Sequence, residues 1–164
     1  MEFVCDASFL IAIYVDIKAP ELLEKLKANE FKFYVPKRVY EEVLRKSKLI
    51  EHHLSLGIIE VVEVRIPDEY EAYLAGLDDG EKEVIAYSLV NCLTPILDDD
   101  VAYKRWMRFE RGFMRTGKFI VNCAKEWNII DKLQAIKYLT SLRRSSFRIK
   151  DSILLDLIEH VLDC

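Results

Sequence analysis

Acidic residues stand at the ends of short apolar runs in a fixed order along this chain, and this arrangement restricts its fold more than any other feature. The positions are Asp6 after Phe3-Val4-Cys5, Glu42 in the pattern that follows Phe31–Val35, Glu81 after Asp79-Gly80, and Asp98-Asp99-Asp100 after Pro95-Ile96-Leu97. In an α/β sheet, the carboxyl ends of strands and the amino ends of helices share one edge, where ligands bind. We therefore expect these carboxylates to meet at one edge of a sheet, as an oxygen-rich site suited to Mg²⁺ or Mn²⁺.

Strand-like and helical patterns alternate through the first two thirds of the chain. Apolar runs at 2–5, 31–35, 58–64 and 95–97 predict strands, and the segments between them, like everything after Lys118, carry helical periods. Such alternation is typical of parallel βαβ units. The 164 residues are 51% hydrophobic, which is enough to build a core. The sequence therefore predicts a single α/β domain over residues 1–164, with a central, mainly parallel sheet between two layers of helices.

Several classes of protein are excluded by what the sequence lacks. No apolar run approaches the roughly 20 residues that a membrane span requires, and the N-terminus does not have the pattern of a signal peptide. The cysteines lie far apart without a CxxC pair, and the histidines form no zinc-ligand spacing with them; the four are Cys5, Cys92, Cys123 and Cys164. We expect a cytoplasmic protein with reduced thiols and no membrane segment.

Each candidate carboxylate also has a purely structural interpretation. Asp6 is in the usual position of a helix N-cap, and Glu42 would lie on a solvated helix face beside Glu41. On a helix that starts at Asp79, Glu81 shares the side that should be buried, whereas Glu83 lies roughly opposite. Burial of Glu81 is costly unless a metal or an arginine compensates its charge, although the helix dipole favours an acidic residue there in either case.

The run Asp98-Asp99-Asp100 is the least ordinary of the acidic signals. Two unit charges about 4 Å apart repel by roughly 4 kcal/mol at an effective dielectric constant of 20. Three aspartates at a strand end therefore indicate a bound cation if they converge. The alternative is a loop in which the three carboxylates point into water.

The charge is distributed unevenly along the chain. Residues 1–100 carry 11 Lys and Arg against 21 Asp and Glu, a balance of −10, whereas residues 101–164 carry 13 against 7, a balance of +6. Within the second part, basic residues spaced as helical neighbours could form one stripe that holds RNA phosphates, with Trp106, Phe109 and Phe113 available for base stacking. The alternative is a solvated surface over core aromatics. The basic residues are Lys104, Arg105, Arg108, Arg111, Arg115 and Lys118.

These motifs, in this order, resemble the PIN-domain family of metal-dependent ribonucleases, which includes the toxins of VapBC-type toxin–antitoxin pairs. The resemblance runs over nearly the whole chain, through Val4–Ser8, Val35–Val43, Gly80–Ala86 and Ile96–Asp99, and through the turn and helix from Thr116 to Lys125. Two departures are visible. The third acidic position, often Asp in the toxins, is Glu81, with Glu83 as its competitor, and Ala102 is followed by Tyr103 where this branch commonly has an arginine.

The resemblance implies a PIN-like α/β/α fold and a divalent-metal-dependent endoribonuclease that uses Mg²⁺ or Mn²⁺. It implies Asp6, Glu42, Glu81 and Asp99 as the catalytic and metal-binding quartet, with Asp98 as an adjacent ligand and Ser8 assisting. It also implies an RNA substrate, a small antitoxin protein as partner and a homodimer. Apolar residues of the early helices are candidates for the dimer interface or, equally, for the core; they are Ile11, Tyr14, Leu22 and Leu26.

Two rival functions belong to other classes. One is a non-catalytic PIN-like scaffold or RNA-binding subunit, which metal-dependent cleavage of RNA would distinguish from a nuclease. The other is a receiver-type phosphoryl-transfer domain, which also gathers aspartates at strand ends. A receiver requires a late lysine directly after a strand, and the chain has no such lysine.

Overall fold

A four-stranded parallel sheet forms the centre of the molecule. The computed structural model describes residues 1–144 and 149–163. The strand order is β3-β2-β1-β4, and every neighbouring pair is parallel. The strands are β1 (Glu2–Cys5), β2 (Lys32–Pro36), β3 (Glu60–Val62) and β4 (Thr94–Ile96). The predicted α/β class with a central parallel sheet flanked by helices is confirmed.

The strands are short, and most of their residues are apolar and buried. In β1, Val4 and Cys5 are fully buried, as is Val35 in β2. Phe3 pairs with Phe33 of β2 on one side and with Thr94 of β4 on the other. Parallel strands buried on both faces read as continuous apolar runs, and the four runs of this sequence have that character.

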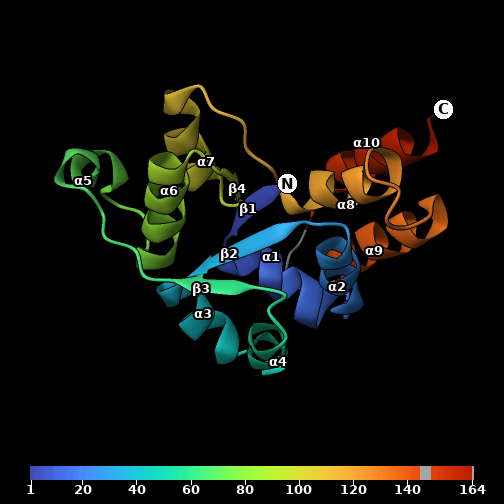
Figure 1. Ribbon diagram of the computed structural model, residues 1–164. Coiled ribbons are helices and arrows are strands. Elements are labelled where there is room, and N and C mark those ends of the chain that lie inside the picture. The colour runs from blue at the N-terminus through green and yellow to red at the C-terminus, as the bar shows by residue number, and fades with distance from the viewer. Residues whose placement is uncertain (145–148, 164) are drawn as a thin grey trace.

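Helices cover the two faces of the sheet (Figure 1). Helices α3 (Lys37–Leu44) and α4 (Leu49–Ser55) lie on one side, and α6 (Asp79–Asn91) and α7 (Asp100–Trp106) lie on the other, with α5 (Asp68–Leu74) beside α6. Strand β1 leads into α1 (Ala7–Ile11), which continues as a π-helical turn, Ala12–Asp16, before α2 (Glu21–Ala28). The sequence predicted one helix from Pro36 in this segment and did not distinguish α4 as a second one.

Three helices complete the chain and lie together on the right of Figure 1: α8 (Thr116–Lys125), α9 (Lys132–Arg144) and α10 (Asp151–Leu162). Helices α8 and α10 touch at Gly117, where an added Cβ atom would lie 2.6 Å from Cδ1 of Leu157. A larger residue at position 117 would therefore require the Leu157 side chain to move.

An aromatic cluster joins the C-terminal helices to the sheet. Phe119 of α8 packs edge-on against Phe9, with ring centroids 4.9 Å apart, and against Phe3 at 5.5 Å. Of the residues that were candidates for either a dimer interface or the core, Tyr14, Leu22 and Leu26 are buried in the core, and Ile11 is partly buried against it. Their apolar side chains fill the space between the helices and the sheet.

The described chain contains no helix that is both long enough and apolar enough to cross a membrane. Of the four cysteines, Cys5 and Cys123 are buried free thiols and Cys92 is an exposed one, while Cys164 lies outside the described residues.

Candidate functional site

A hollow of about 300 Å³ opens at the carboxyl edge of the sheet and is lined mainly by acidic side chains. Its walls come from the end of β1, the π-helical turn, α3, the start of α6 and the start of α7. We refer to it as the acidic pocket. Its lining residues are Asp6, Ala7, Ser8, Ile11, Asp16, Glu42, Asp78, Glu81 and Asp99.

The acidic pocket gathers four carboxylates that the sequence analysis singled out. Asp6 follows β1 as the N-cap residue of α1, and Asp99 is the N-cap residue of α7. Glu42 lies in the second half of α3, and Glu81 lies in the first turn of α6. Residues up to 93 positions apart in the sequence therefore face one hollow.

Asp6 is the most enclosed of the four, with a relative exposure of 7%. Burial raises the pKa of its carboxyl to about 7, and the charges of Glu81 and Asp98 add to the rise. The Ser8 hydroxyl donates to Oδ2 of Asp6 at 2.9 Å, which opposes the rise and fixes the orientation of the carboxylate. Ser8 thus has the assisting position expected of it.

Glu81 is held at the pocket by a capping box. Its backbone N–H donates to Oδ1 of Asp78 at 2.7 Å, and its own Oε2 accepts from the backbone N–H of Asp78 at 3.2 Å. Burial raises the pKa of Glu81 to about 7, and the neighbouring charges of Asp78, Asp99 and Glu42 contribute.

Glu83, the competitor of Glu81, does not line the acidic pocket. Its Oε2 accepts from the backbone N–H of Arg38 at 3.1 Å, at the start of α3. Gly80 lies beside α3, since a Cβ atom at this position would be 3.4 Å from Cγ2 of Val39. The two glutamates therefore point to different places: Glu81 lines the acidic pocket, and Glu83 binds the start of α3.

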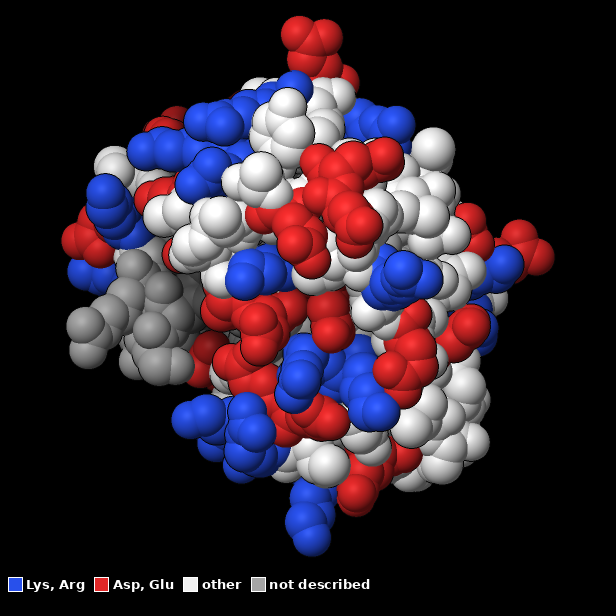
Figure 2. Space-filling view, turned by 90° about the vertical axis from the view of Figure 1, so that its left-hand side faces the viewer, with Lys and Arg blue, Asp and Glu red and all other residues white. Residues whose placement is uncertain are grey.

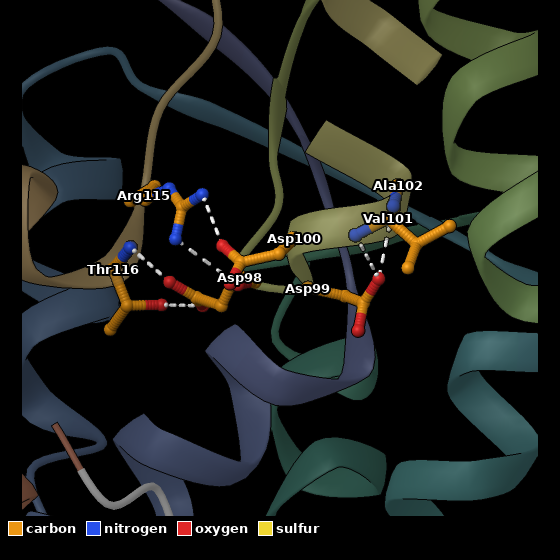
Figure 3. A network of polar contacts seen from close by, with 7 residues as sticks. All are labelled: Asp98, Asp99, Asp100, Val101, Ala102, Arg115 and Thr116. Carbon is orange, nitrogen blue, oxygen red and sulfur yellow. Dashed lines mark hydrogen bonds and ion pairs between the residues drawn. The ribbon is translucent and has the colours of Figure 1, made fainter. Parts of the chain in front are cut away.

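The three consecutive aspartates point in different directions (Figure 3). Asp99 turns to the pocket side, where its Oδ1 accepts from the backbone N–H groups of Val101 and Ala102 at 2.8 and 2.9 Å. Asp98 and Asp100 turn to the start of α8. The three carboxylates therefore neither converge on one point nor all splay into water, which corrects both alternatives drawn from the sequence.

Asp98 is bound by donors from α8 and does not line the acidic pocket. It accepts from the backbone N–H of Thr116 at 2.9 Å, from the Thr116 hydroxyl, and from the Ser8 hydroxyl at 3.3 Å. Burial raises its pKa, and the hydrogen bonds from Thr116 oppose that rise. Asp98 is thus placed behind the pocket as a support, whereas the resemblance implied a ligand.

The predicted basic stripe is only partly formed. Helix α7 ends at Trp106, and Glu110 has a left-handed backbone with φ of 51°, so Arg111 is not a helical neighbour of Arg105 and Arg108. That part of the prediction was wrong because it assumed that one helix continues past Glu110 to Arg111. Trp106 is fully buried and donates to the carbonyl of Arg111 at 3.1 Å, so it is not available for base stacking.

Three of the six basic side chains are engaged within the fold. Arg105 donates to the carbonyl of Ala75 at 3.3 Å, and Arg111 donates to that of Leu89 at 3.0 Å. Arg115 bridges to Oδ1 of Asp100 at 2.8 Å and lies 4.6 Å above the ring of Tyr103. The other three are exposed; they are Lys104, Arg108 and Lys118.

Sequence reasoning missed three residues of this region. Asp16 and Asp78 line the acidic pocket, and Thr116 binds Asp98. Asp78 could have been found, because an Asp three residues before a Glu at a helix start is the pattern of a capping box. Asp16 carries no comparable signal, since it follows an apolar run that ends in a π-helical turn.

The chemistry of the donors fits a divalent cation. Carboxylate and hydroxyl oxygens face the pocket, and the pKa values of Asp6 and Glu81 are raised by burial and, to a smaller extent, by the neighbouring carboxylates. Within the described residues, no three His, Cys, Asp or Glu side chains are grouped closely enough to enclose a metal by themselves. Mg²⁺ typically keeps several waters and uses one or two carboxylates, so a pocket that provides separate carboxylates suits it better than it would suit Zn²⁺.

Figure 2 shows the face that lies on the left of Figure 1. Acidic side chains gather through its middle, and basic side chains lie between and around them. This mixture is the charge pattern expected where a cation and a polyanion meet.

The family comparison decides between the interpretations of this fold. The model of a family described as PIN domain matches residues 2–162. The chain belongs to the PIN-domain family. No curated protein matches it in a sequence search. PIN domains are generally nucleases, so membership of the family indicates a nuclease-like function.

Proposed function

We propose that this PIN-domain protein is a divalent-metal-dependent endoribonuclease whose active site is the acidic pocket. The observation that carries the proposal is the convergence of Asp6, Glu42, Glu81 and Asp99 from four separate elements on one hollow. Mutual repulsion makes such a gathering unfavourable for stability alone, because two of these groups have pKa values raised to about 7. A function that uses the negative charge accounts for it.

The residues have distinct roles in this proposal. Asp6, Glu42, Glu81 and Asp99 supply oxygen ligands for Mg²⁺ or Mn²⁺, and Ser8 orients Asp6 by donating to Oδ2. Asp98 holds the Asp99 loop against α8 through Thr116. When bound, the metal supplies an activated water and offsets the charge that develops on the phosphodiester. No side-chain nucleophile is needed.

The exposed basic residues near α7 and α8 provide the RNA contacts. Lys104, Arg108 and Lys118 are exposed, and the PIN-domain assignment supports RNA as the substrate. Arg105, Arg111 and Arg115 contribute positive potential to this region while they remain tied to backbone or side-chain acceptors. The metal ligands and the phosphate-binding cations are thus carried by different parts of the chain.

The family resemblance supports a finer assignment as the toxin of a toxin–antitoxin pair. In that assignment, the protein works as a homodimer and is bound by a small antitoxin protein in the cytoplasm. Co-purification of the product of an adjacent small gene, and a sedimentation mass of twice 19.2 kDa, are the measurements that test it.

Cleavage of a fluorescent single-stranded RNA in the presence of Mg²⁺ or Mn²⁺ tests the central proposal. The wild type should cleave only with the metal, and Glu81→Gln should abolish cleavage. Glu83→Gln is the matched control, because Glu83 starts the same helix but binds the Arg38 backbone outside the pocket. Binding of RNA without cleavage under every metal condition would instead favour the non-catalytic scaffold.

A further inference from the structure

Hydrogen bonds join three polar side chains next to the π-helical turn: Tyr14 and His53 are buried, whereas Glu24 is exposed. His53 of α4 is fully buried, and both of its ring nitrogens are engaged. Nδ1 lies 2.9 Å from the hydroxyl of Tyr14, and Nε2 lies 3.2 Å from Oε1 of Glu24. These two hydrogen bonds therefore connect three separate elements, namely the π-helical turn, α4 and α2.

The two hydrogen bonds have one consistent direction. A carboxylate oxygen of Glu24 can only accept, so Nε2 of His53 carries the proton and Nδ1 accepts from the Tyr14 hydroxyl. Burial lowers the pKa of His53, although the hydrogen bond to Glu24 opposes this, and a neutral ring is the form that the arrangement requires. Each of the three side chains then has a partner of the correct kind.

Tyr14 belongs to the turn that forms the pocket wall. The turn Ala12–Asp16 is π-helical, with Ile17 N–H donating to the carbonyl of Ala12 at 2.9 Å. Asp16, the last residue of the turn, and Ile11, the last residue of α1 directly before it, both line the acidic pocket. π-Helical turns are rare and have poorer local geometry than an α-helix, so such a turn persists where tertiary contacts hold it.

The side chains at the start of this turn are apolar. Ala12 and Ile13 are fully buried among apolar neighbours. Apolar packing is not directional, so it holds the turn in the core without fixing which way its residues face. The Tyr14 hydroxyl provides a directional contact, and the edge-on packing of the Tyr14 and His53 rings at 5.3 Å supports it.

We infer that Tyr14, His53 and Glu24 are positioning residues, which fix the π-helical turn so that Asp16 and Ile11 face the acidic pocket. This inference rests on the proposed function for its link to catalysis, whereas the link to the geometry of the turn stands by itself. Because none of the three lines the pocket, they act through Asp16 and Ile11 and not on the substrate.

Tyr14→Phe tests this inference with little change in packing. The variant keeps the ring and its contact with His53 but removes the hydroxyl. Tyr138→Phe is the matched control, because Tyr138 is also a buried tyrosine that donates to a glutamate of α2, Glu21, at 3.3 Å. Both variants lose one tyrosine hydrogen bond, but only Tyr14 belongs to the π-helical turn.

Two measurements give separate outcomes. Hydrogen exchange of the amides of residues 12–17 should become at least tenfold faster in Tyr14→Phe and should not change in Tyr138→Phe. The kcat for RNA cleavage should fall about tenfold in Tyr14→Phe with KM nearly unchanged. Glu24→Gln should keep both properties close to wild type, because the amide oxygen of Gln still accepts from Nε2, whereas Glu24→Leu should resemble Tyr14→Phe.

Equal exchange rates at residues 12–17 in wild type and Tyr14→Phe would overturn the inference, whatever the activity. A protein without nuclease activity would overturn the proposed function but would leave the exchange result to decide the role of the three residues. Nitrogen chemical shifts of His53 provide a further check, since a proton on Nδ1 of the neutral ring would contradict the assigned direction.

Discussion

The three consecutive aspartates after β4 show that one acidic run serves two different regions. On the side of α8, Asp98 accepts hydrogen bonds from Thr116, and Asp100 forms an ion pair with Arg115. On the pocket side, Asp99 faces Asp6, Glu42 and Glu81, and burial together with the neighbouring charges raises the pKa of Glu81 to about 7. Adjacent residues of the same type therefore have different surroundings: the side of α8 supplies donors to Asp98 and Asp100, whereas the pocket side brings Asp99 together with other carboxylates.

The largest effect should come from Asp99→Asn, which removes a carboxylate from the pocket side of the run. Asn still caps α7 by accepting from Val101 and Ala102, so the free energy of unfolding should change by less than about 1 kcal/mol. Cleavage of RNA should fall at least about 100-fold, because a ligand oxygen charge is lost. Cleavage assays together with thermal melting in chelator measure both effects, and a large loss of stability would assign Asp99 to the structural side.

Asp98→Ala should have the opposite result. Removing this carboxylate leaves the backbone N–H and the hydroxyl of buried Thr116 without their acceptor, and the free energy of unfolding should fall by about 3 kcal/mol. The loss should be the same with and without Mg²⁺, because Asp98 does not line the pocket. A variant that keeps wild-type stability but no longer responds to metal would show that Asp98 is a ligand after all.

The response of stability to Mg²⁺ should depend on pH. Asp6 and Glu81 have pKa values raised to about 7, so the folded protein binds more protons than the unfolded chain between about pH 4 and pH 7. Their contribution to stability therefore declines as the pH rises through this window and stays low above it. Millimolar Mg²⁺ should raise the melting temperature clearly at pH 8 and little at pH 5.5, where protons compete with the cation. Equal shifts at the two pH values would contradict binding at these carboxylates.

Asp6→Asn should stabilise the metal-free protein. The buried carboxylate is costly when ionised, and Asn can still accept from Ser8, so the gain at pH 8 should be about 2 kcal/mol. At pH 4, where Asp6 is protonated in the folded protein, the difference should nearly vanish. Melting curves of wild type and variant across this range provide the measurement, and a gain that does not depend on pH would require another cause.

The smallest effect should come from Asp100→Asn. Asp100 is exposed, and its ion pair with Arg115 is screened by water, so the melting temperature should fall only slightly, and less in high salt. Its activity should remain near that of the wild type. A loss of activity as large as that of Asp99→Asn would mean that the division between the two sides of the run does not hold.

Sequence patterns predicted the parallel sheet and the gathering of Asp6, Glu42, Glu81 and Asp99, because both follow from periodicity and from the shared edge of an α/β sheet. They could not predict how the acidic run divides. The direction of Asp98 depends on Thr116, which lies 18 residues further along the chain, and no local pattern links the two.

The failures elsewhere have similar causes. The basic stripe failed at Glu110, where a left-handed residue of ordinary type ends the helical period without a Gly or Pro to mark it. Helix α4 is short and its apolar pattern is weak, so its helical state depends on tertiary contacts such as those of buried Ile50 and His53. Asp16 was missed because the π-helical turn changes which side a residue faces, and periodicity assumes a regular helix.

The close approach of α8 and α10 at Gly117 has a consequence for how this protein could be inactivated. Thr116, which holds the aspartate loop, is the first residue of α8, and Gly117 packs directly beneath Leu157 of the last helix. A protease that removed α10 would cut no residue of the acidic pocket, yet it would leave the start of α8 without its cover. Cleavage near the C-terminus would therefore be an effective way for a cell to switch off this site from a distance.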